Sequence, residues 1–123
     1  MDGAPVHVSD VSSLADAQVL FAELRDMAPA LREAVLETVD RAWRDRSFGD
    51  FWSHVMVAEG SIDVSTEPEV SLWDLAALQV IVEEAGGRMT TFGGGPPVHE
   101  GSILTTNGAL HEEMLGRLAG PSA

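Results

Sequence analysis

Two periodicities of hydrophobic residues divide the chain into segments. In four segments apolar residues recur at spacings of three and four, which is typical of an amphipathic helix. In five shorter segments they alternate with polar residues or form brief apolar runs, which is typical of strands. The first pattern predicts helices at 29–43, 51–58, 72–85 and 109–118. The second predicts strands at 6–9, 18–22, 61–66, 88–92 and 102–106.

Residues that favour turns mark several of the expected boundaries. Pro29 suits the first turn of a helix, because the N–H that proline lacks would have no partner there. Gly86 and Gly87 end the third helical segment, and Asn107 is a candidate cap for the last one. The Gly- and Pro-rich stretch 93–97 predicts a loop. Strands that alternate with helices favour an α/β fold in which helices cover a sheet.

The composition narrows the class of protein. A chain of 123 residues has the size of a single domain, and 45% apolar residues favour a globular fold over a disordered one. No apolar run is long enough to span a membrane, and there is no cysteine for a disulfide or a thiolate metal site. Residues 1–5 lack the basic start and apolar run of a signal peptide, so we expect a cytoplasmic protein.

The charge is strongly negative. The formal net charge is −13 at pH 7, with seven arginines and no lysine. Binding to a nucleic-acid backbone or to an anionic membrane surface requires clustered cations, so we expect neither partner. The acidity has two interpretations: it maintains solubility, or some of the carboxylates bind a divalent metal.

Asp74 has two possible roles, because it lies where a helix is expected to begin. As a helix cap, its carboxylate would accept backbone N–H bonds and face the positive end of the helix dipole. As a metal ligand, it would supply one of the carboxylates with which proteins hold Mg²⁺. The small residues Ala76 and Ala77 would allow close packing of the helix start, which favours the second interpretation without proving it.

The same segment carries a resemblance to a known family. Trp73-Asp74-Leu75-Ala76-Ala77, followed by Glu84-Ala85-Gly86-Gly87, resembles the second signature motif of the inositol monophosphatase family, whose members are Mg²⁺-dependent phosphomonoesterases. The resemblance implies that Asp74 binds Mg²⁺. It also implies that Glu67 lies where inositol-specific members place a carboxylate that binds a substrate hydroxyl.

Segments at both ends of the chain extend the resemblance. Residues 2–9 resemble a hairpin from the middle of the family's sequences, and residues 102–108 resemble the family's closing strand and turn. The implied fold is a mixed sheet covered by helices, like the C-terminal half of the layered inositol monophosphatase fold. The expected organisation is therefore one domain, 1–123, that corresponds to this half.

One branch of the family is most similar. Residues 46–52 and 67–74 look like histidinol-phosphatase-type members from actinobacteria. This resemblance implies that Gly49 and Asp50 bind substrate, since a carboxylate at Asp50 suits the ammonium group of histidinol phosphate. Asp50 could equally be a helix cap after Gly49.

The family's first metal motif, Asp-Pro-(Ile/Leu)-Asp-Gly-Thr, has no counterpart in this sequence. Two-metal phosphoryl chemistry needs several carboxylates, and Asp74 alone cannot supply them. We therefore expect the chain alone to be inactive and to bind Mg²⁺ weakly or not at all. It could be a truncated gene product, a split subunit or a proteolytic fragment. We expect it to form a homo-oligomer or to associate with a separate N-terminal half.

Three functions stay open at this point. The chain could be half of a histidinol-phosphatase-like enzyme, a catalytically dead association module, or half of a phosphatase for inositol or sugar phosphates. The histidines show no metal-ligand spacing, so each is expected to be a surface or packing residue: His7, His54, His99 and His111.

Overall fold

The computed structural model describes residues 7–21, 27–47, 51–71, 75–97 and 100–119. Within these residues, five strands form one sheet in the order β2-β1-β3-β5-β4. The strands are β1 (Gln18–Phe21), β2 (Arg44–Ser47), β3 (Val64–Ser71), β4 (Arg88–Thr90) and β5 (Glu100–Thr106). The helices are η1 (Leu14–Asp16), α1 (Pro29–Arg41), α2 (Phe51–Ala58), α3 (Leu75–Glu84) and α4 (His111–Ala119).

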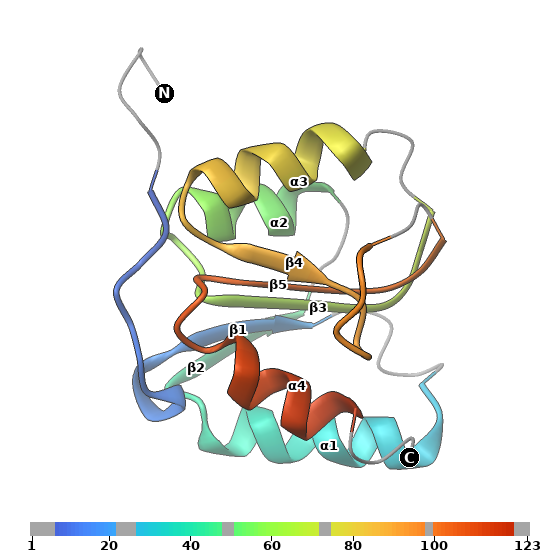
Figure 1. Cartoon of the computed structure of the whole chain (residues 1–123). Helices are drawn as coiled ribbons and strands as arrows, with labels where there is room; N and C mark the ends of the chain where they lie inside the picture. Colours follow the sequence, from blue (N-terminus) through green and yellow to red (C-terminus); the bar gives the residue numbers. More distant parts are fainter. Residues whose placement is uncertain (1–6, 22–26, 48–50, 72–74, 98–99, 120–123) are drawn as a thin grey trace.

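The sheet is mixed, as predicted. Strands β1, β2 and β3 are parallel, whereas β5 runs antiparallel to both β3 and β4. Helices α2 and α3 cover one face, and α1 and α4 cover the other (Figure 1). The α/β layers expected from the alternation of strands and helices are therefore confirmed.

The alternation of side chains along the strands builds a core on each side of the sheet. Val19 and Phe21 point into the core under α1 and α4, whereas Leu20 between them packs with Val57 and Ile62 on the opposite face. On β5, Leu104 joins the first core and Ile103 joins the core under α2 and α3. Each strand thus contributes apolar side chains to both layers, as a sheet covered on both faces requires.

Glycine is favoured at both positions after α3, for a conformational reason at Gly86 and a steric reason at Gly87. Gly86 has a positive φ of 98°, and its N–H donates to the carbonyl of Glu83, while the N–H of Gly87 donates to Val82. This pair of bonds is the Schellman arrangement that ends many helices. A Cβ on Gly87 would lie only 2.5 Å from the carbonyl oxygen of Thr106, so close packing of the helix end on β5 requires glycine there.

Several predicted boundaries are confirmed. Helices α1, α2 and α4 begin within two residues of their predicted starts, and β1 and β5 occupy the predicted segments. The loop at 93–97 is irregular, and the predicted cap is present: the Oδ1 of Asn107 accepts a hydrogen bond from the N–H of Leu110 at 3.2 Å. Helix α3 also matches, although the predicted start at 72–74 lies outside the described residues.

Three strand predictions are wrong: one segment forms no strand in its described residues, and two strands differ in their extent. Residues 7–9 form no strand; they are held by one backbone bond, from the N–H of Val8 to Ala85, and by side-chain bonds. The predicted strand at 61–66 starts at Val64 instead, because Ile62 packs in the core and Asp63 uses its carboxylate to bind the start of β1. Strand β4 also ends early, at Thr90, before a turn that joins Thr91 to Gly95.

Strand β2 was not predicted from the pattern of hydrophobic residues. It lies at an edge of the described sheet, and its residues Arg44, Asp45 and Arg46 are exposed. Charged edge strands of this kind lack the apolar alternation on which the prediction depends.

A buried polar cluster holds the segment before η1 against the sheet. The Asp63 carboxylate is 4% exposed and accepts hydrogen bonds from the N–H of Gln18, at 2.7 Å, and from the Ser9 hydroxyl. The Asn107 amide donates to the Ser9 oxygen at 3.0 Å and to the carbonyl of Val11 at 2.6 Å. One carboxylate and one amide thus join β1, β3 and β5 to the first described segment.

None of the helices in the described part of the chain combines the length and the apolar character that crossing a membrane requires.

Candidate functional site

The parallel strands define the edge of the sheet after which the predicted site residues follow in the sequence. Strands β1, β2 and β3 run in the same direction, so their carboxyl ends lie at the same edge. In open α/β sheets, ligands bind outside this edge. Gly49 and Asp50 follow β2 in the sequence, and Asp74 follows β3. These three residues lie outside the described residues, as does Trp73, so their assigned roles stay predictions.

Glu67 is the predicted site residue that the structure describes. It lies on β3 one residue beyond Thr66, the last residue of β3 that pairs with β1. The register with β5 shifts at this point, since Glu67 pairs with Ile103 and Val70 pairs with Gly101. This shift is a β-bulge, which tolerates the following Pro68 and redirects nearby side chains.

His54 is the partner of Glu67. It lies on α2 and is completely buried, and its Nε2 is 3.5 Å from the Oε2 of Glu67, which is itself only 4% exposed. On the other side of the ring, Nδ1 is 2.8 Å from the Oγ1 of Thr105 on β5. The structure therefore connects α2, β3 and β5 through three buried polar side chains.

The chemistry of these groups determines the tautomer of His54. A carboxylate only accepts hydrogen bonds, so the ring nitrogen that faces Glu67, Nε2, carries the proton. Nδ1 then accepts a hydrogen bond from the Thr105 hydroxyl. The contact at 3.5 Å is too long for a strong hydrogen bond, and it acts chiefly as an electrostatic contact with the buried carboxylate.

Sequence reasoning expected His54 to be a surface or packing residue, and it missed this polar contact. The available signal was the place of His54 directly before the apolar run 55–58 of α2. A histidine on the buried face of such a helix needs a polar partner. The partners come from distant strands, and the sequence pattern does not show which ones they are.

The second buried histidine has a structural role on the opposite face of the sheet. The Thr90 hydroxyl donates to the carbonyl of Thr91, so it accepts a hydrogen bond from Nε2 of His111 at 2.9 Å. The Thr106 hydroxyl lies 2.9 Å from Nδ1, to which it donates. Burial, followed by the charge of Arg88, lowers the pKa of His111 to about 4, so the ring is neutral at pH 7.

No group of three or more Asp, Glu, His or Cys side chains in the described ranges could hold a metal ion. The described residues therefore do not themselves form a magnesium site. The predicted ligand Asp74 is not among them, so its role is neither supported nor contradicted by this observation.

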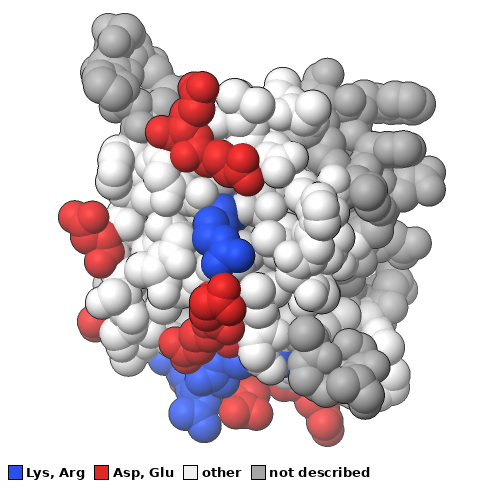
Figure 2. All heavy atoms as spheres, viewed as in Figure 1, with Lys and Arg blue, Asp and Glu red and all other residues white. Residues whose placement is uncertain are grey.

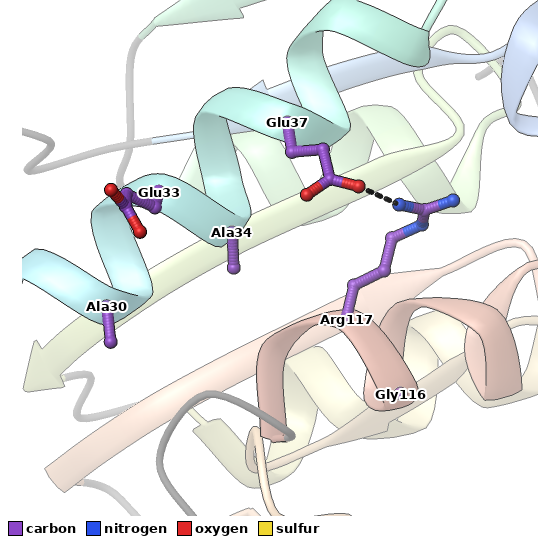
Figure 3. Close-up of a pocket in the computed structure, with 6 residues that line it drawn as sticks. All are labelled: Ala30, Glu33, Ala34, Glu37, Gly116 and Arg117. Atoms are coloured by element: carbon purple, nitrogen blue, oxygen red, sulfur yellow. Dashed lines mark ion pairs between the residues drawn. The ribbon is translucent and has the colours of Figure 1, made fainter.

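Two surface hollows in the described part of the chain lie beside α1 and α4. One hollow of about 320 Å³ lies between α1 and α4 and is lined by Ala30, Glu33, Ala34, Glu37, Gly116 and Arg117 (Figure 3). Arg117 is 3.7 Å from the Glu37 carboxylate and 3.0 Å from Glu113. On the face shown in Figure 2, acidic and basic side chains alternate, and Arg88 pairs with Glu112 at 2.9 Å. These arginines are already paired with carboxylates, so they are poorly suited to binding a phosphate group.

A sheet of parallel and antiparallel strands that is covered by helices on both faces places the chain in the α/β class. Comparison with known proteins identifies the family within this class. Residues 1–120 match the inositol monophosphatase family, and the chain belongs to this family.

The most informative relatives are actinobacterial. The chain is 48% identical to a histidinol-phosphatase of Mycobacterium tuberculosis, over 96% of this chain and 47% of the relative. It is 46% identical to a histidinol-phosphatase of Streptomyces coelicolor, over 92% of this chain and 43% of the relative. The chain therefore spans about half the length of the curated relatives it matches. The predicted branch and the correspondence to a C-terminal half are confirmed.

Solved structures confirm the fold class. An inositol monophosphatase-II from Staphylococcus aureus superposes with a TM-score of 0.84 at 26% identity, over 96% of this chain and 46% of that one. An inositol monophosphatase from Anabaena superposes with a TM-score of 0.80 at 28% identity, over 97% of this chain and 49% of that one.

Proposed function

We propose that this chain is the C-terminal half of a phosphatase that hydrolyses a small phosphate monoester of the histidinol phosphate type. The observation that carries the proposal is the 48% identity to a histidinol-phosphatase along nearly the whole chain. The carboxylate of Glu67 supports it, because Glu67 lies on β3 directly beyond the carboxyl end of β1, where a bound substrate would meet a hydrogen-bond acceptor.

The proposed roles divide between binding and metal coordination. Glu67 accepts a hydrogen bond from a hydroxyl or ammonium group of the substrate, and Gly49 and Asp50 contribute to the same recognition. Asp74 supplies one carboxylate ligand to Mg²⁺, which when bound would neutralise phosphate charge and activate the attacking water. In this proposal the other ligands come from the half of the enzyme that this chain does not span.

The surface of α3 supports association with that half or with a second copy. Val80 is 53% exposed and Ile81 is 38% exposed, and the neighbouring Ala76 and Ala77 are also exposed. These four residues form the α3 apolar face. Apolar side chains grouped on one helix are typical of a surface that another element covers. The α3 apolar face includes Ala76 and Ala77, which belong to the same sequence motif as Asp74.

Reconstitution tests this proposal. The chain is co-expressed with the N-terminal half of the Mycobacterium tuberculosis relative, and phosphate release is measured from histidinol phosphate and from inositol 1-phosphate with and without Mg²⁺. We expect Mg²⁺-dependent hydrolysis that is faster with histidinol phosphate and is lost in Asp74→Asn. Faster hydrolysis of inositol 1-phosphate would favour the inositol phosphatase alternative. A stable complex without turnover would favour an inactive association module.

A further inference from the structure

Glu67 is held by a second residue that the sequence did not identify. The side chain of His54 is completely buried between α2 and the sheet, and its Nε2 faces the Oε2 of Glu67 at 3.5 Å. Thr105, also completely buried, holds the other side of the ring at 2.8 Å. We propose that His54 is a positioning residue that fixes the carboxylate of Glu67 for substrate binding. This inference rests on the proposed function, since that proposal assigns Glu67 to the substrate.

The backbone around Glu67 explains why a positioning residue is needed. Pairing of β3 with β1 extends to Thr66, and the register with β5 shifts immediately after Glu67. Pairing with β1 therefore stops before Glu67, and pairing with β5 is interrupted after it and resumes at Val70, which reduces the backbone constraint on the Glu67 side chain. The contact with His54, which lies on α2, replaces part of that constraint.

Burial makes the contact rigid. A carboxylate that is 4% exposed has lost most of its hydration, and an ionised group in that position needs a compensating donor or charge. The Nε2 of His54 faces this carboxylate at 3.5 Å, which makes an electrostatic contact rather than a strong hydrogen bond, and the bond between Thr105 and Nδ1 fixes the rotation of the ring. The fixed ring therefore limits the positions that the Glu67 carboxylate can take.

His111 provides a matched control, because it is also completely buried and bonded to threonines. Both of its ring nitrogens are occupied by the hydroxyls of Thr90 and Thr106. Replacing it should destabilise the fold without changing the orientation of Glu67.

The kinetic test uses the reconstituted enzyme and three variants. His54→Leu removes both ring contacts, His54→Gln retains an N–H donor at about the position of Nε2, and His111→Gln is the control. We expect His54→Leu to raise KM for histidinol phosphate about tenfold, the size expected when one hydrogen bond to a charged group is lost. kcat with p-nitrophenyl phosphate should change less than about twofold, since this ester offers no hydroxyl or ammonium group to Glu67. His54→Gln should restore most of the KM, and His111→Gln should leave it unchanged.

A structural measurement separates this inference from the proposed function. Crystal structures of the chain and its variants should show the side-chain torsions of Glu67 changed in His54→Leu and retained in His54→Gln. Unchanged torsions in His54→Leu would overturn the positioning role, whether or not the reconstituted enzyme is active. Absent turnover by the wild type would instead overturn the proposed function. If His54→Leu does not fold, Thr105→Val releases the ring from its other side and should displace Glu67 in the same way; an undisplaced Glu67 there also overturns the proposal.

Discussion

Replacing Asp63 with alanine should destabilise the chain by about 3–5 kcal/mol, a value that follows from the hydrogen bonds it removes. The Asp63 carboxylate is 4% exposed and accepts one bond from the N–H of Gln18 and one from the Ser9 hydroxyl. Hydrogen bonds to charged groups contribute about 1.5–3 kcal/mol each. Alanine removes both and leaves two partly buried donors without this acceptor. A domain of this size has about 5–15 kcal/mol of stability in total, so the loss is large.

Asp63→Asn separates the two bonds. The Asn oxygen can still accept from Gln18, but the amide group would then face Ser9, whose oxygen already accepts from Asn107. The Ser9 proton loses its acceptor, so we expect a smaller loss of about 1–2 kcal/mol. Asp10→Ala is the matched control, because Asp10 is exposed and its removal should change stability by less than about 0.5 kcal/mol.

Urea denaturation at pH 7, followed by circular dichroism, measures these differences. Hydrogen exchange of the Gln18 amide provides a local measurement, since its protection depends directly on Asp63. The reasoning would be refuted if Asp63→Ala lost less than about 1 kcal/mol, or if it lost no more than Asp10→Ala.

Three further outcomes are expected. Because the pKa of His111 is about 4 in the fold and 6.5 when unfolded, the unfolded chain binds more protons between these values, and stability falls as pH drops through that window. The full shift corresponds to about 3 kcal/mol; urea titrations from pH 6.5 to 5 should show a steeper slope for the wild type than for His111→Gln. The isolated chain should hydrolyse neither histidinol phosphate nor inositol phosphate and should bind Mg²⁺ weakly; tight binding in calorimetry would mean that Asp74 belongs to a more complete acidic site. The chain should dimerise or bind a separate half through the α3 apolar face, so Val80→Glu should weaken association in light scattering, and a stable wild-type monomer at micromolar concentration would contradict this.

The helices could be predicted from the sequence because their information is local. Pro29 starts α1, Gly86 ends α3, and the apolar spacing between such residues specifies the buried face of each helix. The extents of the strands were less accurate, because pairing depends on distant residues. Asp63 lies within an alternating segment, yet its carboxylate binds the backbone of β1 and the strand begins one residue later.

The candidate site was predictable only where a motif contained it. Glu67 was identified through its distance from the Trp-Asp motif, whereas the role of His54 depends on a contact across the sheet to Thr105 and Glu67. Residues joined in this way share no periodicity and no spacing in the sequence. Their relationship follows from the register between β3 and β5, which the hydrophobic pattern does not define.

The two edges of the described sheet affect whether strands from other molecules can add to it. One edge is β2, with the exposed charges Arg44, Asp45 and Arg46, and the other is β4, which is three residues long. Sheet edges that are charged or short are poor templates for adding strands from other molecules. These sheet edges therefore disfavour fibril-like growth, whereas the α3 apolar face stays exposed for association with a partner.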